Sequence, residues 1–269
     1  MNIATIFDCA GLIFKADFLT TIRYRNAMVG TIIGVLFQVA TYYYLSRAIG
    51  PGFRPDGVPA FAFLLIGIGI SGYLHSATYS FVRSVREAQS SGTFEILMSS
   101  STPGTLVLML MGISSSLAQL LELGLYMVFG LALSGFRLEQ ANIAGALAIF
   151  ALSLLVTVAI GLLCASVQIA TQKSDSVVSW LGASAALAGG ALFPISVLPG
   201  WLQSIARFNP LLYCLDGLRA ALYKNASFSE LSMPLLALGV GGLITLPLSL
   251  FLLEFTLRRA RRSGTLGFY

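Results

Sequence analysis

The stretch F-P-I-S-V-L-P-G-W-L-Q-S-I-A-R-F-N-P-L-L-Y-C-L-D-G-L-R-A-A-L-Y, from Phe193 to Tyr223, is apolar enough to enter a membrane but too interrupted to cross one. Pro194, Pro199 and Pro210 each break a helix, because proline lacks the backbone donor and clashes with the preceding turn. As a helix, the longest uninterrupted piece, Pro210–Tyr223, is about 21 Å long, short of the roughly 30 Å hydrocarbon core. We therefore expect a segment that dips into the membrane at the mouth of a pathway.

The composition of the whole chain places it in a membrane. Of its 269 residues, 57% are hydrophobic and 10% are charged, whereas a soluble domain carries roughly 25% charged residues. One transmembrane domain, residues 1–269, accounts for the chain. The net charge of +5 is spread beside apolar runs and forms no basic face with interleaved aromatic residues, so we expect no nucleic-acid partner.

The apolar runs predict an all-α, polytopic membrane protein with six transmembrane helices. Residues 1–25 add an N-terminal interfacial amphipathic helix, because apolar residues from Ile3 to Phe18 recur on one face at helical spacing. Residues 194–223 form the outer re-entrant helical segment between spans five and six. The predicted spans are 27–49, 60–82, 104–134, 142–171, 176–193 and 234–257.

Charge asymmetry sets the expected orientation. More of the 16 lysines and arginines fall in segments that are inner if the N-terminus is inside, and the R-R-A-R-R sequence at 258–262 is the strongest of these anchors. The pattern predicts a multi-pass protein of the cytoplasmic (inner) membrane with both termini in the cytoplasm.

Two polar residues within the spans are candidates for function. Glu122 is costly in a membrane if ionised, so it is either a proton relay or substrate contact, or a neutral acid that is bonded to Gln119 or to a neighbouring helix. His75 is either a packing residue with a hydrogen bond or a residue that lines a pathway. In span five, Gly182, Ala186 and Gly190 make a flat face, suited to packing within one subunit, to a dimer seam or to a pathway wall.

The sequence indicates that the chain is not an enzyme and holds no cofactor or metal. Cys9, Cys164 and Cys214 lie far apart in apolar surroundings, which is typical of small buried hydrophobic residues. No G-x-x-x-x-G-K-[ST] loop is present, so the chain does not bind ATP by that motif.

The loop between spans two and three, residues 83–103, combines charges with an apolar cluster. Phe94, Ile96, Leu97 and Met98 lie among polar residues, and exposed apolar side chains on such a loop require a partner to cover them. The alternative is a helical cap on the third span.

Two motifs give the chain a family resemblance. The loop R-E-x-x-x-x-G-T-F-E-I-L, Arg86 to Leu97, with Pro103 after it, resembles the first coupling segment of the type-2 ATP-binding-cassette (ABC) exporter permeases. The segment from Phe193 to Arg219 is similar to the family's re-entrant region. The order of the motifs, the chain length and the six-span count also fit.

The resemblance implies a homodimer, or a pair with a related permease, in membrane lipids and bound to two copies of a cytoplasmic ABC ATPase subunit. ATP and Mg²⁺ would be held by that partner. The implied coupling residues are Arg86, Glu87, Gly92, Thr93, Phe94, Glu95 and Leu97. The implied outer gate consists of Phe193, Pro194, Pro199, Trp201, Asn209, Pro210, Asp216 and Arg219.

We therefore expect an ATP-driven exporter permease for a lipid-like, drug-like or glycan substrate. Span five is nearly free of aromatic residues, which favours lipid-like or drug-like cargo over a glycan. Two alternatives stay open: a proton-coupled secondary transporter that uses Glu122, and a non-transporting membrane scaffold.

Overall fold

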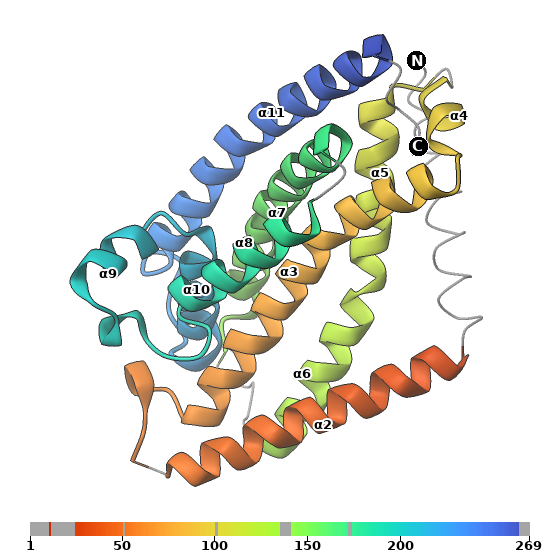
Figure 1. Ribbon diagram of the computed structural model, residues 1–269. Helices are drawn as coiled ribbons and strands as arrows, with labels where there is room; N and C mark the ends of the chain where they lie inside the picture. The colour runs from red at the N-terminus through yellow and green to blue at the C-terminus, as the bar shows by residue number, and fades with distance from the viewer. Residues whose placement is uncertain are drawn as a thin grey trace.

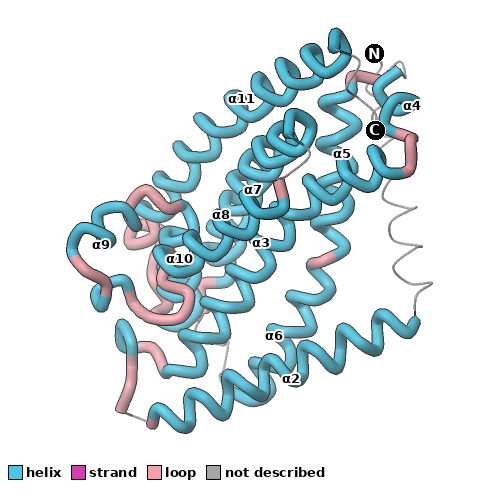
Figure 2. Tube along the Cα trace, in the orientation of Figure 1, coloured by secondary structure: helices cyan, strands magenta, loops and turns pink. Residues whose placement is uncertain are grey.

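The computed structural model describes residues 11, 25–50, 52–99, 102–134, 141–171 and 174–263. Every regular element in these ranges is a helix, which confirms the all-α prediction (Figures 1 and 2). The predicted interfacial helix at residues 1–25 lies outside the described residues, apart from positions 11 and 25.

Five stretches of the described chain are long and apolar enough to cross a membrane. A helix satisfies its backbone donors and acceptors internally, which is why such apolar sequences fold as helices where water is absent. The third stretch is interrupted at Gln119, where α5 ends and α6 begins. The helices are α2 (Arg25–Ile49), α3 (Ala60–Ser90), α5 (Gly104–Ala118) with α6 (Leu120–Ser134), α7 (Ile143–Thr171) and α11 (Ser232–Ser263).

The predicted fifth span is shorter than the sequence indicated. Helix α8 (Asp175–Ala188) has 14 residues, so it is about 21 Å long, shorter than the roughly 30 Å hydrocarbon core. It ends before Gly190, whose φ of +72° lies in the left-handed region that glycine tolerates. Six spans are therefore not confirmed; five candidates are observed.

Proline governs the segment between α8 and α11. Pro194 precedes the short 3-10 helix η3 (Ile195–Val197), Pro199 precedes α9 (Gly200–Ala206), and Pro210 is the first residue of α10 (Pro210–Tyr223). Asn209 caps α10, because its side-chain oxygen accepts from Leu211 N at 3.1 Å. The predicted breaks at these three prolines are thus confirmed.

The helices have two ends, which we name after the short helices that lie there. At the α4 end, α4 (Phe94–Ser99) lies close to the end of α11, and Arg261 donates to Met98 O at 2.8 Å (Figure 1). At the α10 end, α10 contacts α3, which follows the 3-10 helix η1 (Pro55–Gly57), and α9 lies against α8. Helices α3 and α7 run between the two ends and α2 lies along α6 at the edge of the bundle.

Glycines let the central helices approach closely around one aromatic ring. Phe81 of α3 is 2% exposed, and its ring occupies the space that a Cβ at Gly112 of α5 or at Gly161 of α7 would need. Small residues at such contacts are typical of helix packing in membranes. The three helices are therefore joined at this ring.

We predict that Gly112→Ala destabilises the protein, because the new methyl group overlaps the Phe81 ring. The expected cost of such overpacking is about 1–3 kcal/mol, measured as a lower melting temperature of the purified protein. Gly124→Ala is the matched control, since no atom lies within 4 Å of its Cβ position in α6. Equal melting temperatures for the two variants would contradict the packing described here.

Candidate functional site

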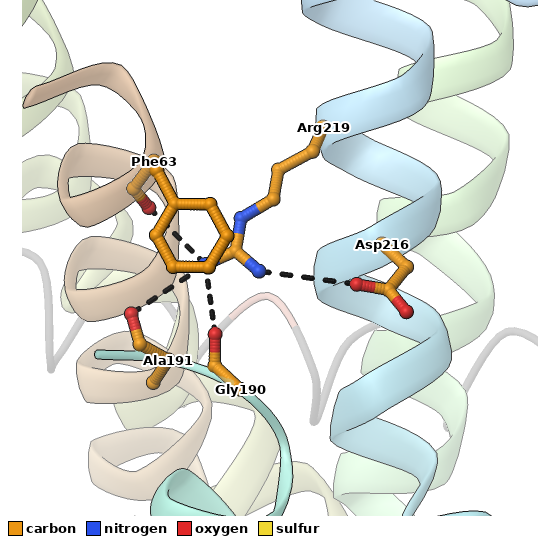
Figure 3. Close-up of polar contacts among 5 residues, drawn as sticks. All are labelled: Phe63, Gly190, Ala191, Asp216 and Arg219. Atoms are coloured by element: carbon orange, nitrogen blue, oxygen red, sulfur yellow. Dashed lines mark hydrogen bonds and ion pairs between the residues drawn. The ribbon is translucent and has the colours of Figure 1, made fainter. Parts of the chain in front are cut away.

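The buried guanidinium of Arg219 joins three elements at the α10 end. Arg219 is 4% exposed, and its Nη2 donates to Phe63 O at 3.1 Å and Gly190 O at 2.9 Å, and lies 3.5 Å from Ala191 O. The guanidinium carbon lies 3.5 Å from the centroid of the Phe63 ring (Figure 3). We call Arg219, Phe63, Gly190, Ala191 and Asp216 the Arg219 cluster.

This arrangement offsets the cost of burying a charge. An arginine in an apolar site must replace its lost water with acceptors, and the carbonyls of Gly190 and Ala191 are free to serve because they lie in the turn after α8. The aromatic face adds a cation–π attraction of up to about 2 kcal/mol when water is excluded. The ion pair between Nη1 and Asp216 is long, at 3.9 Å, and Asp216 is half exposed, so it contributes little.

Gly67 leaves the space in which the cluster assembles. A Cβ at Gly67 of α3 would collide with Ala191 O and with the Arg219 guanidinium. The turn after α8 can therefore lie directly on α3 only because residue 67 has no side chain.

Other residues of the implied outer gate have separate roles. Asn209 donates to Ala185 O at 2.8 Å, which ties the start of α10 to α8. Trp201 is 67% exposed and lies outside the cluster, while Phe193 and Pro194 are half-buried. Of the implied gate residues, the structure thus brings Arg219 and Asp216 together in the cluster, while Trp201 lies on the exposed surface.

Cys214 lies in the core next to these contacts. It is fully buried, and burial raises the pKa of its thiol to about 12, so that the reactive thiolate is scarce at neutral pH. Cys164 is also buried, so both fit the predicted packing role, whereas Cys9 lies outside the described residues.

A mostly apolar cavity of about 400 Å³ lies between α3, α7, α8 and the α9–α10 segment. His75 lines it, together with hydroxyl groups such as those of Ser71 and Thr157. The His75 ring occupies the position that a Cβ at Gly182 would need, so at this residue the flat face of α8 packs within the subunit. We call this cavity the apolar groove.

A second cavity, of about 190 Å³, lies between α2, α3 and α6 and is lined by Glu122 and Gln119. Among the described residues, the Glu122 carboxyl has no hydrogen-bond or ion-pair partner. The hydrogen bond between Glu122 and Gln119 that the sequence suggested is therefore not formed. We call this cavity the polar pocket.

The loop at the α4 end has one buried face and one exposed face. Phe94 is 1% and Met98 is 4% exposed, whereas Ile96 is 73% exposed. Thr93 begins the helix by accepting from Leu97 N at 3.0 Å, and Gly92 before it has a φ of +68°. The loop is therefore a helical cap on the bundle that also presents an apolar side chain outward.

The charged residues of this loop lie on the exposed side. Arg86, Glu87 and Glu95 are exposed, and Arg83 donates to Glu87 at 2.7 Å. These residues lie at the α4 end, whereas the Arg219 cluster lies at the α10 end. The implied coupling residues and the implied outer gate are therefore at opposite ends of the helix bundle.

A buried polar network that the sequence reasoning missed connects this end to α8. The Oε1 of Gln168 accepts from Ser174 Oγ at 2.6 Å, and Gln168 lies 3.4 Å from Gln89 of α3. All three residues are at most 2% exposed. Their sequence signal is weak, because each is an isolated polar residue next to a predicted span boundary.

Comparison with known protein families shows to which family this chain belongs. The sequence model described as "ABC-2 type transporter" matches residues 11–223, most of the chain. The chain belongs to the ABC-2 type transporter family. The comparison with curated proteins gives no match.

Membership identifies the chain as the membrane domain of an ABC permease, and not as a catalytic ATPase domain. Association with an ABC ATPase and dimerisation are general properties that the family implies. The matched residues include the loop at the α4 end, the Arg219 cluster and all of α10.

We predict that Arg219→Lys loosens the α10 end. Lysine lacks the planar fork that reaches several carbonyls at once, so buried acceptors lose their donor at a cost of about 2 kcal/mol. For a chain of this size this corresponds to a melting temperature that is lower by about 4–8 °C. The matched control is Arg207→Lys, because Arg207 is exposed; if both variants melt alike, the Arg219 cluster does not stabilise this end.

Proposed function

We propose that this chain is the permease subunit of an ATP-driven exporter in the cytoplasmic membrane, with both termini in the cytoplasm. The observation that carries the proposal is the loop at the α4 end, whose buried face holds it on the bundle and whose exposed face leaves Ile96 uncovered. An apolar side chain in that position fits a pocket on a cytoplasmic ATPase subunit.

The ATPase pushes on the loop, and α3 carries the movement. Helix α3 has 31 residues and is therefore about 46 Å long. It continues into the loop at one end and holds Phe63 of the Arg219 cluster near the other. ATP-driven movement of the loop thus reaches the α9–α10 segment, which we propose as the re-entrant outer gate.

The functional unit contains two permease copies and two ATPase copies. The cargo passes between the permease copies, and the apolar groove contributes to its path. The lining of the groove, largely aliphatic with a few hydroxyl groups and His75, suits lipid-like or drug-like molecules better than a glycan.

The test is whether the full chain captures an ABC ATPase through Ile96. We predict that the purified chain co-purifies with a soluble protein that contains a nucleotide-binding loop, in a ratio of two to two. Ile96→Asp is expected to reduce the recovered ATPase at least tenfold, because a charge replaces the apolar contact.

Ile205→Asp is the matched control, since Ile205 is 56% exposed on α9 at the opposite end. It is expected to leave the recovery of the ATPase unchanged. Equal recovery with Ile96→Asp and with the unaltered chain would contradict the assignment of the loop as the docking site.

A further inference from the structure

The polar pocket brings acceptor atoms together inside an apolar surface. Tyr126 is 4% exposed, and its hydroxyl, like the Oε1 of Gln119, is buried without a hydrogen-bond partner. Both residues line the pocket with Glu122, Gln38 and Ser76. A buried polar group without a partner costs about 1–3 kcal/mol, so a ligand whose donor reaches these atoms offsets that cost.

The shape of the pocket depends on α3 and on the break between α5 and α6. The ring of Tyr126 lies where a Cβ at Gly69 would be, so α6 approaches α3 closely beside the pocket. At the break, Gln119 O accepts from both Glu122 N at 3.1 Å and Leu123 N at 3.2 Å. This local 3-10 turn places Gln119 and Glu122 at the same pocket.

The charge of the lining indicates the sign of the ligand. Among the described residues that line the polar pocket, Glu122 is the one carboxylic acid, and none is a lysine, arginine or histidine. The rings of Tyr73 and Tyr126 add aromatic surface, which attracts cations. A carboxylate, uncharged acceptors and aromatic rings together favour an organic ammonium group over an anion.

The surroundings of the pocket indicate an apolar tail on the same ligand. Phe37 on α2 is 72% exposed and Leu121 on α6 is 51% exposed, so two of the helices that bound the pocket carry exposed apolar side chains. The pocket, at about 190 Å³, has room for a small head group but not for a whole amphiphile, so the tail would lie along these exposed side chains.

We propose that the polar pocket binds the ammonium head group of a cationic amphiphile, with Glu122 as its counter-charge and Tyr126 and Gln119 as hydrogen-bond acceptors. This proposal names a cargo class and in that respect rests on the proposed function. The binding itself needs neither the ATPase nor ATP. The pocket borders a different set of α3 residues from the apolar groove, so the two cavities are distinct.

The experiment measures binding to the full chain in lipid nanodiscs without any ATPase. Isothermal titration compares decylammonium, whose N–H groups can donate hydrogen bonds, with decyl sulfonate, which carries the same tail and the opposite charge, and empty nanodiscs supply the background. The expected result is saturable binding of the cation and no saturable binding of the sulfonate.

Variants locate the binding at the pocket. Glu122→Gln is expected to weaken cation binding by about tenfold or more, which corresponds to about 1.4 kcal/mol. Tyr126→Phe is expected to weaken it by about threefold, the effect of one hydrogen bond. Glu122→Asp keeps the charge and is expected to keep most of the binding, which separates loss of charge from misfolding.

Glu254→Gln is the matched control, because Glu254 is a half-exposed carboxyl on α11 and is expected to leave binding unchanged. Equal cation affinity of the unaltered chain and Glu122→Gln, or equal binding of the sulfonate, overturns the proposal. Since no ATPase is present, that result leaves the docking test on Ile96 unaffected, and failure of the docking test leaves the binding result intact.

Discussion

The contact between Arg219 and the carbonyls of Gly190 and Ala191 determines how the α10 end is built. These carbonyls are available because α8 stops at Ala188, so that Gly190 and Ala191 lie in the turn that follows it and outside the helix. Arg219 supplies the missing donor from α10, and Phe63 supplies an aromatic face from α3. The short α8 and the position of α10 are therefore two consequences of one interaction, and Gly67 makes room for both.

Helix α3 links every part of the proposed mechanism. It carries Phe63 at the α10 end, His75 on the apolar groove, Tyr73 on the polar pocket and Gln89 in the buried network at the α4 end. A helix held by close contacts along its length, such as that of Phe81 with Gly112 and Gly161, moves as a unit. A displacement of the loop at the α4 end thus changes both cavities together with the Arg219 cluster.

Much of the fold could be predicted from the sequence, because its signals are local. Long apolar runs and prolines fix the five candidate spans and the breaks at Pro194, Pro199 and Pro210. The fifth predicted span was the exception, since the apolar run continues past Ala188 while the chain turns at Gly190. Hydropathy does not detect that turn, which depends on the backbone conformation of a single glycine.

The candidate site was less predictable, because its partners are distant in sequence. Arg219 donates mainly to backbone oxygen atoms of Phe63 and Gly190, and backbone atoms have no sequence signal. Phe94 was grouped with the coupling residues, yet its side chain is in the core, and Ile96 presents the apolar surface. Glu122 was recognisable as unusual, but its pocket with Tyr126 required the structure.

We propose that this chain supplies a passage across the membrane and that a separate ATPase subunit supplies the energy. The most direct measurement is uphill movement of an amphiphilic dye into vesicles that contain the purified permease, with and without its co-purifying ATPase. We expect the dye to accumulate only when the permease, the ATPase and ATP are all present. Accumulation by the permease alone under a proton gradient would contradict it.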